Sequence, residues 1–386
     1  MRETLLSTTG IAAAFAFHLS PVRDNPVFET SMPSPSVDII VPVWNNPFET
    51  RSCLASILTY TPGARLIVVD NGSTRQTELM LDEFAESLGD QGLFMSCERN
   101  IGLVPALNRA LAQSDRDWAV IVKPQVAVAQ GWLTQLQAAA DTTKAGIVTP
   151  LFCGNGAPQL PAPPDGAQFS ETCSISFATL LLKRELRMAA GPFDESLDGG
   201  EWCLKDYIRK TETAGFRSLV VRSPVLGCTP ETIFGSSERR QEMYRNSRDT
   251  YLARWGVSRT YCLYFGTELP ASGLEHMLEA ILSRARQGNR FTLILHRKQL
   301  KEFRKQGWHA LHTGITLRQL PIFGTMRALG RLVSALQDEH PDLVLVKGSE
   351  LATFPENRPA ISFDRIAGST KSGYSAAYSV TDPETP

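Results

Sequence analysis

The residue whose type and position most directly suggest chemistry is Asp70, which ends the apolar run ARLIVVD and precedes Asn71-Gly72. A carboxylate at the end of a strand can accept two hydrogen bonds from a vicinal diol such as a ribose. Aspartate before Asn-Gly is also a common turn or helix-cap residue, which is the structural alternative. Of these two interpretations we favour ligand binding by Asp70.

Two further places in the sequence carry aromatic or amide side chains that could bind a ligand. Trp44 and Asn45 follow the apolar run VDIIVPV, where an indole could cover the face of a nucleobase and an amide could bind its edge. For Trp44, packing in the core is the alternative. Asn100 and Gly102 lie in a later polar stretch. A glycine there would let the backbone approach a nucleotide closely, although both residues also suit a plain turn.

Strands and helices that alternate along the chain would position these residues. Residues 37–44 and 64–70 are almost continuously apolar and rich in β-branched residues, as in strands buried on both faces of a parallel sheet. Between them, Asn46-Pro47-Phe48-Glu49 predicts the start of a helix with Asn46 as its N-cap. The alternation continues with helices at 77–88 and 104–113, a strand at 118–123 and a strand over Cys173–Leu182.

The alternation restarts near residue 257, so we predict an α/β fold with a second, smaller unit and with ligands at the carboxyl ends of the strands. The second series comprises strands at 260–266, 290–296 and 342–348, a helix from a capping box at Ser272 to about Arg286, and helices at 297–306 and 326–339. The expected domains are an N-terminal arm and linker (1–36), a first domain (37–256), a small α/β unit (257–350) and a flexible tail (351–386).

The composition excludes several classes of protein. With 42% hydrophobic and 20% charged residues among 386, the chain is globular, and a net charge of −1 provides no basic field for nucleic acid. Seven cysteines without a Cys-x-x-Cys pair argue against a disulfide framework or a structural zinc site, and they fit a reducing cytoplasm. The apolar run at 11–19 is too short to span a bilayer, and a loosely ordered arm is favoured over a signal peptide.

A series of short motifs follows in order through the first predicted domain. They are Val41-Pro42-Val43-Trp44-Asn45, Val68-Val69-Asp70-Asn71-Gly72-Ser73, Asn100-Ile101-Gly102 with Ala106 and Asn108, Gln130-Gly131-Trp132-Leu133, Ala190-Gly191-Pro192-Phe193-Asp194-Glu195, Ala214-Gly215-Phe216-Arg217, and Tyr244-Arg245-Asn246 to Trp255-Gly256. In these motifs the chain resembles the family 2 glycosyltransferases, whose fold is the nucleotide-sugar-binding GT-A type. One motif alone would be unspecific, but their number and order make the resemblance specific.

The resemblance implies an enzyme that transfers a sugar from a nucleotide-diphosphate sugar to a hydroxyl acceptor, with inversion. The implied partners are this donor and a glycan, lipid-linked or other acceptor, in polysaccharide or glycan assembly in the cytoplasm or at the inner face of the membrane. The donor-binding residues carried over are Val41, Trp44, Asn45, Asp70, Asn71, Asn100, Gly102, Lys123 and Gln125. The alternative is a non-catalytic GT-A protein that binds a nucleotide or a partner after losing its metal and base residues.

The sequence departs from the family at the metal site. Most GT-A enzymes bind Mg²⁺ or Mn²⁺ through an acidic motif that would fall at Lys123-Pro124-Gln125. No Asp or Glu occurs from 118 to 140, no histidine occurs from 36 to 256, and Cys228 lies near the place of the family's metal-binding histidine. We assign no metal ligand, keep Mg²⁺ or Mn²⁺ as an alternative, and consider Lys123 as a fixed cation for the diphosphate. An exposed lysine in an inactive site is the other interpretation.

The family's catalytic base is a carboxylate that deprotonates the acceptor hydroxyl, and two residues compete for this role. Counting forward from Phe193-Asp194-Glu195 points to Glu201. Counting back from Ala214-Gly215-Phe216 points to Asp206 and leaves Leu204 at the usual position of the base. Glu201 is the first choice and Asp206 the second, and two solvated surface acids are the alternative.

The second unit has no assigned role. Its predicted helix at 297–306 places Leu300 and Phe303 among several cations, so peripheral contact with an anionic membrane is one interpretation, and a solvated outer face is the favoured one. A third hypothesis makes this unit half of a two-domain nucleotide-sugar site, with Gly266 at its first strand end, although no phosphate-binding motif supports it.

Overall fold

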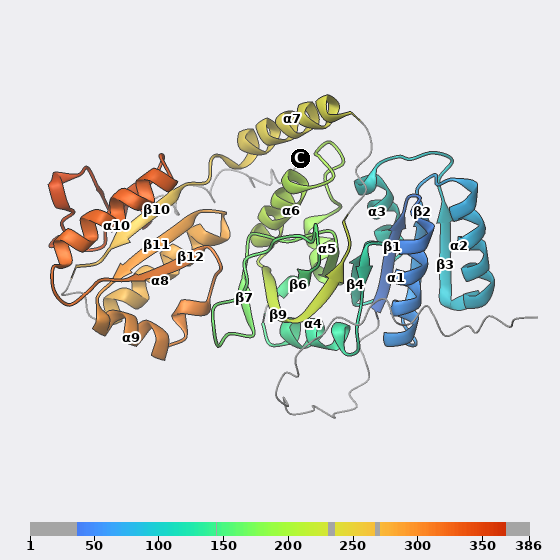
Figure 1. Ribbon diagram of the computed structural model, residues 1–386, viewed down its shortest axis with the longest axis horizontal. Helices are drawn as coiled ribbons and strands as arrows, with labels where there is room; N and C mark the ends of the chain where they lie inside the picture. The colour runs from blue at the N-terminus through green and yellow to red at the C-terminus, as the bar shows by residue number, and fades with distance from the viewer. Residues whose placement is uncertain (1–36, 144, 231–235, 267–270, 368–386) are drawn as a thin grey trace, which may run out of the picture. The chain divides into compact units, whose positions relative to one another are not determined.

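The computed structural model describes residues 37–143, 145–230, 236–266 and 271–367, whose strands form two sheets (Figure 1). The α/β fold class is confirmed, because both sheets consist mainly of parallel strands with helices between them in the chain. The expectations for the N-terminal arm at 1–36 and for residues 368–386 lie outside the described residues.

The first sheet is mixed, with a parallel half that carries the polar strand ends. Its strands are β1 (Val37–Val43), β2 (Arg65–Asp70), β3 (Gly92–Ser96), β4 (Trp118–Val122), β5 (Val126–Ala127), β6 (Ala145–Cys153), β7 (Phe169–Glu171), β8 (Thr179–Lys183) and β9 (Arg217–Cys228). They follow the order β3-β2-β1-β4-β8-β6-β9-β5, with β7 paired to β9. Strands β3, β2, β1 and β4 are parallel, whereas β8 is antiparallel to both of its neighbours. The predicted strands at β1, β2 and β4 are confirmed, and β3 was not predicted.

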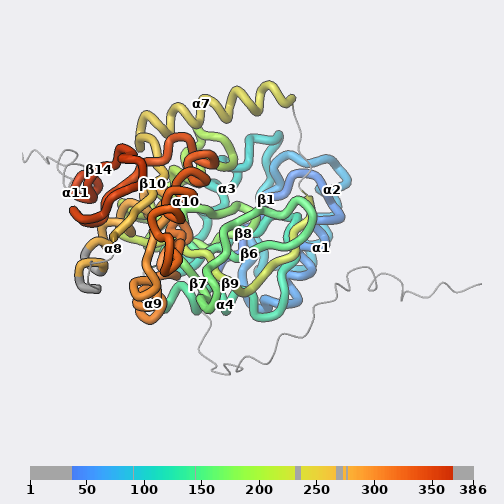
Figure 2. Tube along the Cα trace, turned by 60° about the vertical axis from the view of Figure 1, so that its left-hand side comes forward, coloured from blue at the N-terminus to red at the C-terminus, as the bar shows by residue number. Residues whose placement is uncertain are grey.

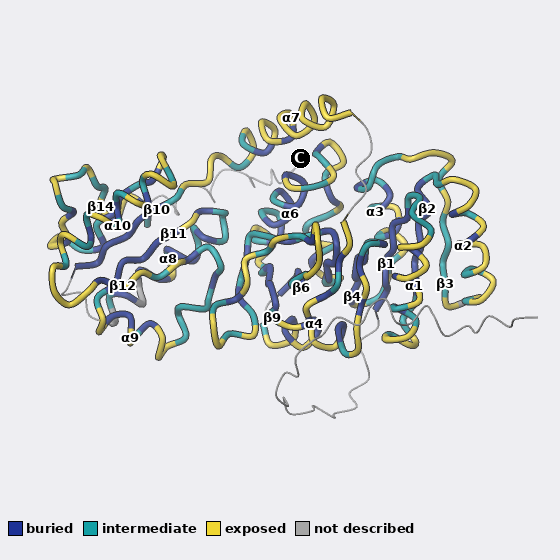
Figure 3. Tube along the Cα trace, in the orientation of Figure 1, coloured by how far each residue is buried: buried dark blue, intermediate teal, exposed yellow. Residues whose placement is uncertain are grey.

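Helices pack on both faces of this sheet because its buried strands point alternate side chains into two cores. The helices are α1 (Pro47–Tyr60), α2 (Arg75–Leu88), α3 (Leu103–Ala112), α4 (Trp132–Asp141), α5 (Arg184–Ala190), α6 (Glu201–Thr213) and α7 (Ser237–Trp255). Ile39 and Val41 share a core with α1, α2 and α4. Ile40 shares the other core with α3, α5 and α6. Helix α7 differs from the others, because it is exposed along most of its length (Figure 3).

The start of α1 differs from the expectation. Asn46 lies in the left-handed region with φ at 53°, and its side chain makes no capping hydrogen bond. Its carbonyl instead accepts a hydrogen bond from Thr50 Oγ1 at 2.8 Å. Asn45 is also left-handed, with φ at 56°. Asparagine tolerates this conformation better than most residues, so this pair allows a sharp turn directly after β1.

The second sheet is entirely parallel. Its strands are β10 (Thr260–Tyr264), β11 (Arg290–Leu295), β12 (Ile315–Gln319), β13 (Val344–Lys347) and β14 (Ile361–Ser362), and its helices are α8 (Ala271–Arg286), α9 (Arg297–Lys305), α10 (Thr325–Glu339) and α11 (Asp364–Ala367). The strands follow the order β12-β11-β10-β13-β14. The predicted strands at β10, β11 and β13 and the predicted helices α8, α9 and α10 are confirmed, whereas β12 and β14 were not predicted. The side chain of Ser272, the expected cap of α8, lies outside the described residues.

The end of the described chain is ordered against the second sheet. β14 pairs with β13, and Phe363 and Ile366 are buried in the core. Arg284 of α8 donates from Nη2 to the carbonyl of Ile366 at 3.0 Å. The short helix α11 contacts α8 (Figure 2). The prediction that a flexible tail begins at residue 351 is therefore wrong for residues 361–367, because two apolar side chains in this segment find a place in the core.

The apolar residues of the basic helix α9 face the protein interior. Leu300 and Phe303 are buried, and the ring of Phe303 meets that of Trp308 edge to face at 5.2 Å between centroids. A membrane interface would need these side chains on the outside, so the structure favours the solvated outer face. None of the described helices combines the length and the apolar character needed to cross a membrane.

A buried contact connects β7 with the second sheet. Arg286 donates two hydrogen bonds to the carboxylate of Glu171, at 2.6 and 2.9 Å. The backbone of Glu171 also bonds to Leu311 and Thr313. His312, buried between these two residues, accepts a hydrogen bond from Gly314 N at Nδ1. Burial lowers the pKa of His312 to about 4, so its imidazole is neutral at neutral pH.

We expect acidification to weaken this contact through His312. Because its folded pKa of about 4 lies below the ordinary 6.5, the stability that the neutral ring contributes is present above pH 6.5 and is lost as the pH falls toward 4. His312→Asn should therefore lose about 2 kcal/mol less unfolding free energy than the wild type between pH 7.5 and 5. Urea unfolding at both pH values measures this, with His340→Asn as the control. Equal losses in wild type and His312→Asn would contradict the prediction.

Candidate active site

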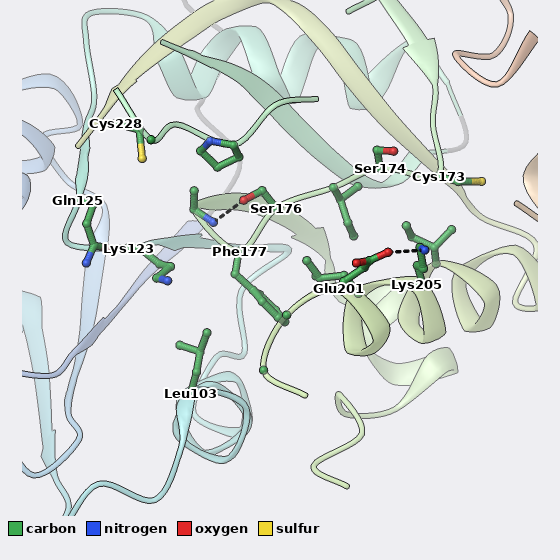
Figure 4. Close-up of a pocket in the computed structure, with 18 of the residues that line it drawn as sticks. Leu103, Lys123, Gln125, Cys173, Ser174, Ser176, Phe177, Glu201, Lys205 and Cys228 are labelled. Carbon is green, nitrogen blue, oxygen red and sulfur yellow. Dashed lines mark hydrogen bonds and ion pairs between the residues drawn. The ribbon is translucent and has the colours of Figure 1, made fainter. Parts of the chain in front are cut away.

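A cavity of about 440 Å³ opens beyond the carboxyl end of β4, next to the first residues of α3 and α6. We call it the Glu201 cavity. Lys123 and Gln125, which follow β4, lie on one side of Phe177, and Glu201 and Lys205 of α6 lie on the other side (Figure 4). The cavity therefore gathers a predicted cation, a predicted amide and the first-choice base, as expected for the carboxyl edge of an α/β sheet.

A smaller hollow of about 110 Å³ adjoins this cavity and is called the Trp44 hollow. Lys123 and Gln125 line both spaces. Predicted ligand-binding residues that line the hollow besides these two are Trp44, Asn71 and Asn100. With Asn46, an aromatic ring, four amides and a cation thus surround one concave surface, which suits a planar base attached to an anionic group.

Asn71 organises the loop that forms one wall of the hollow. Its Nδ2 donates to Asn100 Oδ1 and to the carbonyl of Gly102, both at 3.1 Å. Its Oδ1 accepts a hydrogen bond from Ile101 N at 2.9 Å. Asn100 Oδ1 also accepts from Gly102 N at 2.8 Å, and Gly102 itself has φ at 97°. These two asparagines hold the backbone of the loop in place while they line the hollow.

Three predicted donor-binding residues have structural roles. Asp70 is 7% exposed and accepts a hydrogen bond from Ser73 N at 3.0 Å, so it braces the turn after β2. Asn45 Oδ1 accepts from Thr74 N at 2.8 Å and braces the same turn. Val41 is completely buried in the core. None of the three lines the Glu201 cavity or the Trp44 hollow. A ligand-binding role for Asp70 and Asn45 stays a prediction, whereas the side chain of Val41 is inaccessible to a ligand.

The residues at the expected metal site do not fit a divalent cation. Within the described ranges, no three His, Cys, Asp or Glu side chains gather where they could hold a metal ion. The residues at the expected place are Lys123, Gln125 and Cys228, all of which line the Glu201 cavity. A lysine repels a cation, and one amide oxygen with a thiol is a poor ligand set for Mg²⁺ or Mn²⁺. Gln125 Oε1 is buried without a hydrogen-bond partner in the described structure, so it can still accept a bond from a ligand hydroxyl.

Glu201 is held as a carboxylate by two neighbours. Lys205, one helical turn away, donates to its Oε1 at 2.5 Å, and the hydroxyl of Tyr244 in α7 donates to its Oε2 at 2.9 Å. Burial acts to raise the pKa of Glu201, but these hydrogen bonds and the charge of Lys205 outweigh it, so the pKa lies below its ordinary value. Glu201 also begins α6, and the helix dipole favours a negative charge there. It is therefore ionised at neutral pH, as a general base must be.

Asp206, the second-choice base, is a structural residue. It is 1% exposed and lines neither the Glu201 cavity nor the Trp44 hollow. Its carboxylate pairs with Arg254 at 2.5 Å and with Lys210 at 3.0 Å, and it accepts a hydrogen bond from Trp255 Nε1 at 2.8 Å. A carboxylate with these three partners has no free access to an acceptor hydroxyl, so the assignment of Asp206 as a base is wrong on geometric grounds.

Two residues that support Glu201 were not identified from the sequence. Lys205 could have been found, because a spacing of four residues on a helix places it beside Glu201. Tyr244 stands 43 residues away on another helix, and its position in the closing motif gave no sign of this contact. Sequence spacing reports neighbours within one helix, whereas pairs between helices depend on packing.

Comparisons with known proteins point to one family. The model of the family described as Glycosyl transferase family 2 matches residues 38–179. An N-acetylglucosaminyltransferase from Rhizobium leguminosarum bv. viciae is 31% identical over 156 residues, which cover 34% of this chain and 36% of the relative. The match thus spans about a third of that relative's length. The glycosyltransferase AglE from Haloferax volcanii is 25% identical over 224 residues, which cover 54% of this chain and 71% of the relative.

Among solved structures, the chain is similar to a mannosyltransferase from Pyrobaculum calidifontis that was solved in complex with GDP-Man and Mn²⁺. The identity is 18%, the similarity covers 80% of this chain and 81% of that chain, and the TM-score is 0.43.

Gly72 provides a test of how tightly the wall of the Trp44 hollow is packed. It has φ at 73°, and a Cβ atom there would lie 2.6 Å from Asn100 N. Gly63 is a matched control, with φ at 84° and open space around its missing side chain. We expect Gly63→Ala to cost about 1 kcal/mol of unfolding free energy through backbone strain alone. Gly72→Ala should cost about 2 kcal/mol more, because the chain at Asn100 must move. Equal losses in urea unfolding would contradict the close packing.

Proposed function

Residues 38–179 belong to the family 2 glycosyltransferases, and from this premise we propose that the chain transfers a sugar from a nucleotide-diphosphate sugar to a hydroxyl acceptor. The observation that carries the proposal is that Lys123, Gln125 and Glu201, from separate parts of the chain, line one cavity beside the Trp44 hollow. A cation, an uncommitted hydrogen-bond acceptor and an ionised carboxylate are the groups that such a transfer uses.

The donor would lie across the two spaces. Its base would occupy the Trp44 hollow, against the aromatic ring, and its diphosphate would extend toward Lys123, which lines both spaces. The positive charge of Lys123 would stabilise the negative charge that develops on the departing diphosphate. Gln125 would accept a hydrogen bond from a donor hydroxyl through its unpartnered Oε1.

Glu201 would act as the base in a single displacement. As the acceptor oxygen attacks the anomeric carbon, its proton passes to the carboxylate of Glu201, and the bond from the anomeric carbon to the diphosphate oxygen breaks. The electron pair of that bond leaves with the nucleoside diphosphate. One displacement from the opposite face inverts the anomeric configuration. For the biological setting we propose polysaccharide or glycan assembly, on the grounds that both relatives are named as glycosyltransferases.

Lys123→Ala should weaken donor binding sharply if Lys123 takes the place of a metal. Loss of one charge-assisted contact should raise the dissociation constant of the donor about 10- to 100-fold. We would measure it by calorimetric titration with UDP, GDP, dTDP and their common sugars, in Mn²⁺ and in EDTA. Wild-type binding should be the same in both conditions. Lys298→Ala, in the exposed face of α9, is the control. Binding that requires Mn²⁺ would overturn this role, and no binding in either condition would favour the non-catalytic alternative.

Glu201→Gln should lower the rate of donor hydrolysis, in which water is the acceptor, by about 10²- to 10⁴-fold. Donor affinity should stay unchanged, because the substitution preserves shape and acts only on proton transfer. Asp206→Asn is the contrasting variant: it should lower stability by about 1–3 kcal/mol, because the partly exposed Arg254 loses one of its two charged partners and keeps Asp194. Activity per folded molecule should persist in Asp206→Asn. A fully active Glu201→Gln enzyme would remove Glu201 from the mechanism.

The pH profile separates the effect of Lys205 from the proton transfer itself. The rate of donor hydrolysis should fall on the acid side only below the ordinary glutamate pKa of 4.5. The reason is that Lys205 and Tyr244 together lower the pKa of Glu201. Lys205→Met removes one of these partners, so the pKa rises and the acid limb should move to higher pH. An acid limb that does not move would show that another group controls it.

A further inference from the structure

A second and larger cavity, of about 870 Å³, adjoins the Glu201 cavity. Lys205, Ile208 and Arg290 line both spaces. We call it the arginine cavity, because four arginines and Lys205 line it. Residues of α6 form part of its lining, and the first residues of β10, β11 and β12 form another part. None of the groups assigned to the donor lies in it.

The charges that line the arginine cavity are unbalanced. Its cations are Lys205, Arg209, Arg259, Arg286 and Arg290, and Glu339 is the one carboxylate among its described lining residues. Two cations are already neutralised, since Arg286 pairs with Glu171 and Lys205 pairs with Glu201. His312 also lines the cavity, but burial keeps it neutral by lowering its pKa to about 4. The surplus positive charge therefore belongs mainly to the remaining arginines.

Arg259 and Arg290 are held next to each other by a backbone hydrogen bond. Arg290 begins β11 and pairs in register with Thr260, while its backbone N donates to the carbonyl of Arg259 at 3.0 Å. Both side chains are exposed, and neither guanidinium makes a hydrogen bond or an ion pair with any described residue. Both arginines line the arginine cavity, where an anion would offset their unpaired positive charge. Guanidinium groups match phosphate oxygens in a bidentate manner.

We propose that the arginine cavity binds a phosphate group carried by the acceptor, through Arg259 and Arg290. This inference rests on the proposed function, because it assigns the acceptor side of the same reaction. Arg290 lines both cavities, so an acceptor whose phosphate lies on the arginine pair can extend its hydroxyl into the Glu201 cavity. The acceptor class is then a phosphate-bearing hydroxyl compound, and its phosphate can belong to a sugar phosphate or to a lipid phosphate.

Calorimetric titration of the full chain tests the phosphate site with four probes. Glucose 6-phosphate and octyl phosphate represent the two sources of phosphate, and glucose and octyl glucoside are their neutral counterparts. We expect the phosphate probes to bind and the neutral ones not to bind, with affinity falling as salt rises. Binding of glucose 6-phosphate alone would identify a sugar phosphate, and stronger binding of octyl phosphate a lipid phosphate. Equal binding of charged and neutral probes would overturn the inference.

Two sets of variants assign the binding to the arginine pair. The double variant Arg259→Gln, Arg290→Gln should weaken phosphate binding at least about tenfold. Arg297→Gln, Arg304→Gln on the exposed face of α9 removes the same charge and should have no effect. Thr316→Glu adds a carboxylate to the cavity without removing an arginine and should also weaken binding, whereas Thr316→Gln should not. Equal affinity in the arginine variant and its control would overturn the inference.

Donor titration separates the two proposals. The single variant Arg259→Gln should bind the nucleotide-diphosphate sugar as the wild type does, because Arg259 lines neither the Glu201 cavity nor the Trp44 hollow. If donor binding is present and the arginine variant has no effect on phosphate, the acceptor inference fails alone. If no donor binds while phosphate binding depends on the arginine pair, the proposed function fails and the anion site stands.

Discussion

The hydrogen bonds of the Asn71 side chain are the interaction on which the candidate site depends. This buried amide bonds to the side chain of Asn100 and to the backbone of Ile101 and Gly102. Because the Asn71 amide is buried, its hydrogen bonds are costly to leave unmade, so they hold the loop in one arrangement. The loop leads directly into α3, whose first residue, Leu103, lines both the Glu201 cavity and the Trp44 hollow.

Fixed charges characterise this candidate site. Lys123 lines it together with an amide and a thiol that do not form a ligand set for a hard cation. On the other side of Phe177, Lys205 and Tyr244 keep Glu201 ionised despite its partial burial. In the proposed displacement, the cation would stand at the leaving diphosphate and the carboxylate at the nucleophile.

The second sheet contributes cations to the neighbourhood of this site. Its contact with β7 depends on the ion pair between Arg286 and Glu171 and on the backbone bonds around His312. These bonds lie close to the arginine cavity, where both Arg286 and His312 are lining residues. The role that we propose for the small unit is to supply Arg259, which directly precedes β10, and Arg290, which begins β11. No part of that role requires the unit to bind the nucleotide.

The sequence by itself determined the α/β class and the buried strands that end at Asp70 and before Lys123, because apolar periodicity and polar strand ends are local signals. Its choice of Glu201 as the base stays a prediction. It did not determine which polar residues face the ligand. Only the tertiary structure made Asp70 a brace of its turn and removed Asp206 from the site through Arg254, 48 residues away. It alone placed Tyr244 on Glu201 and Arg259 beside Arg290. The physical reason is that such pairs form across packed elements, and their distance in the sequence leaves no periodic pattern to detect.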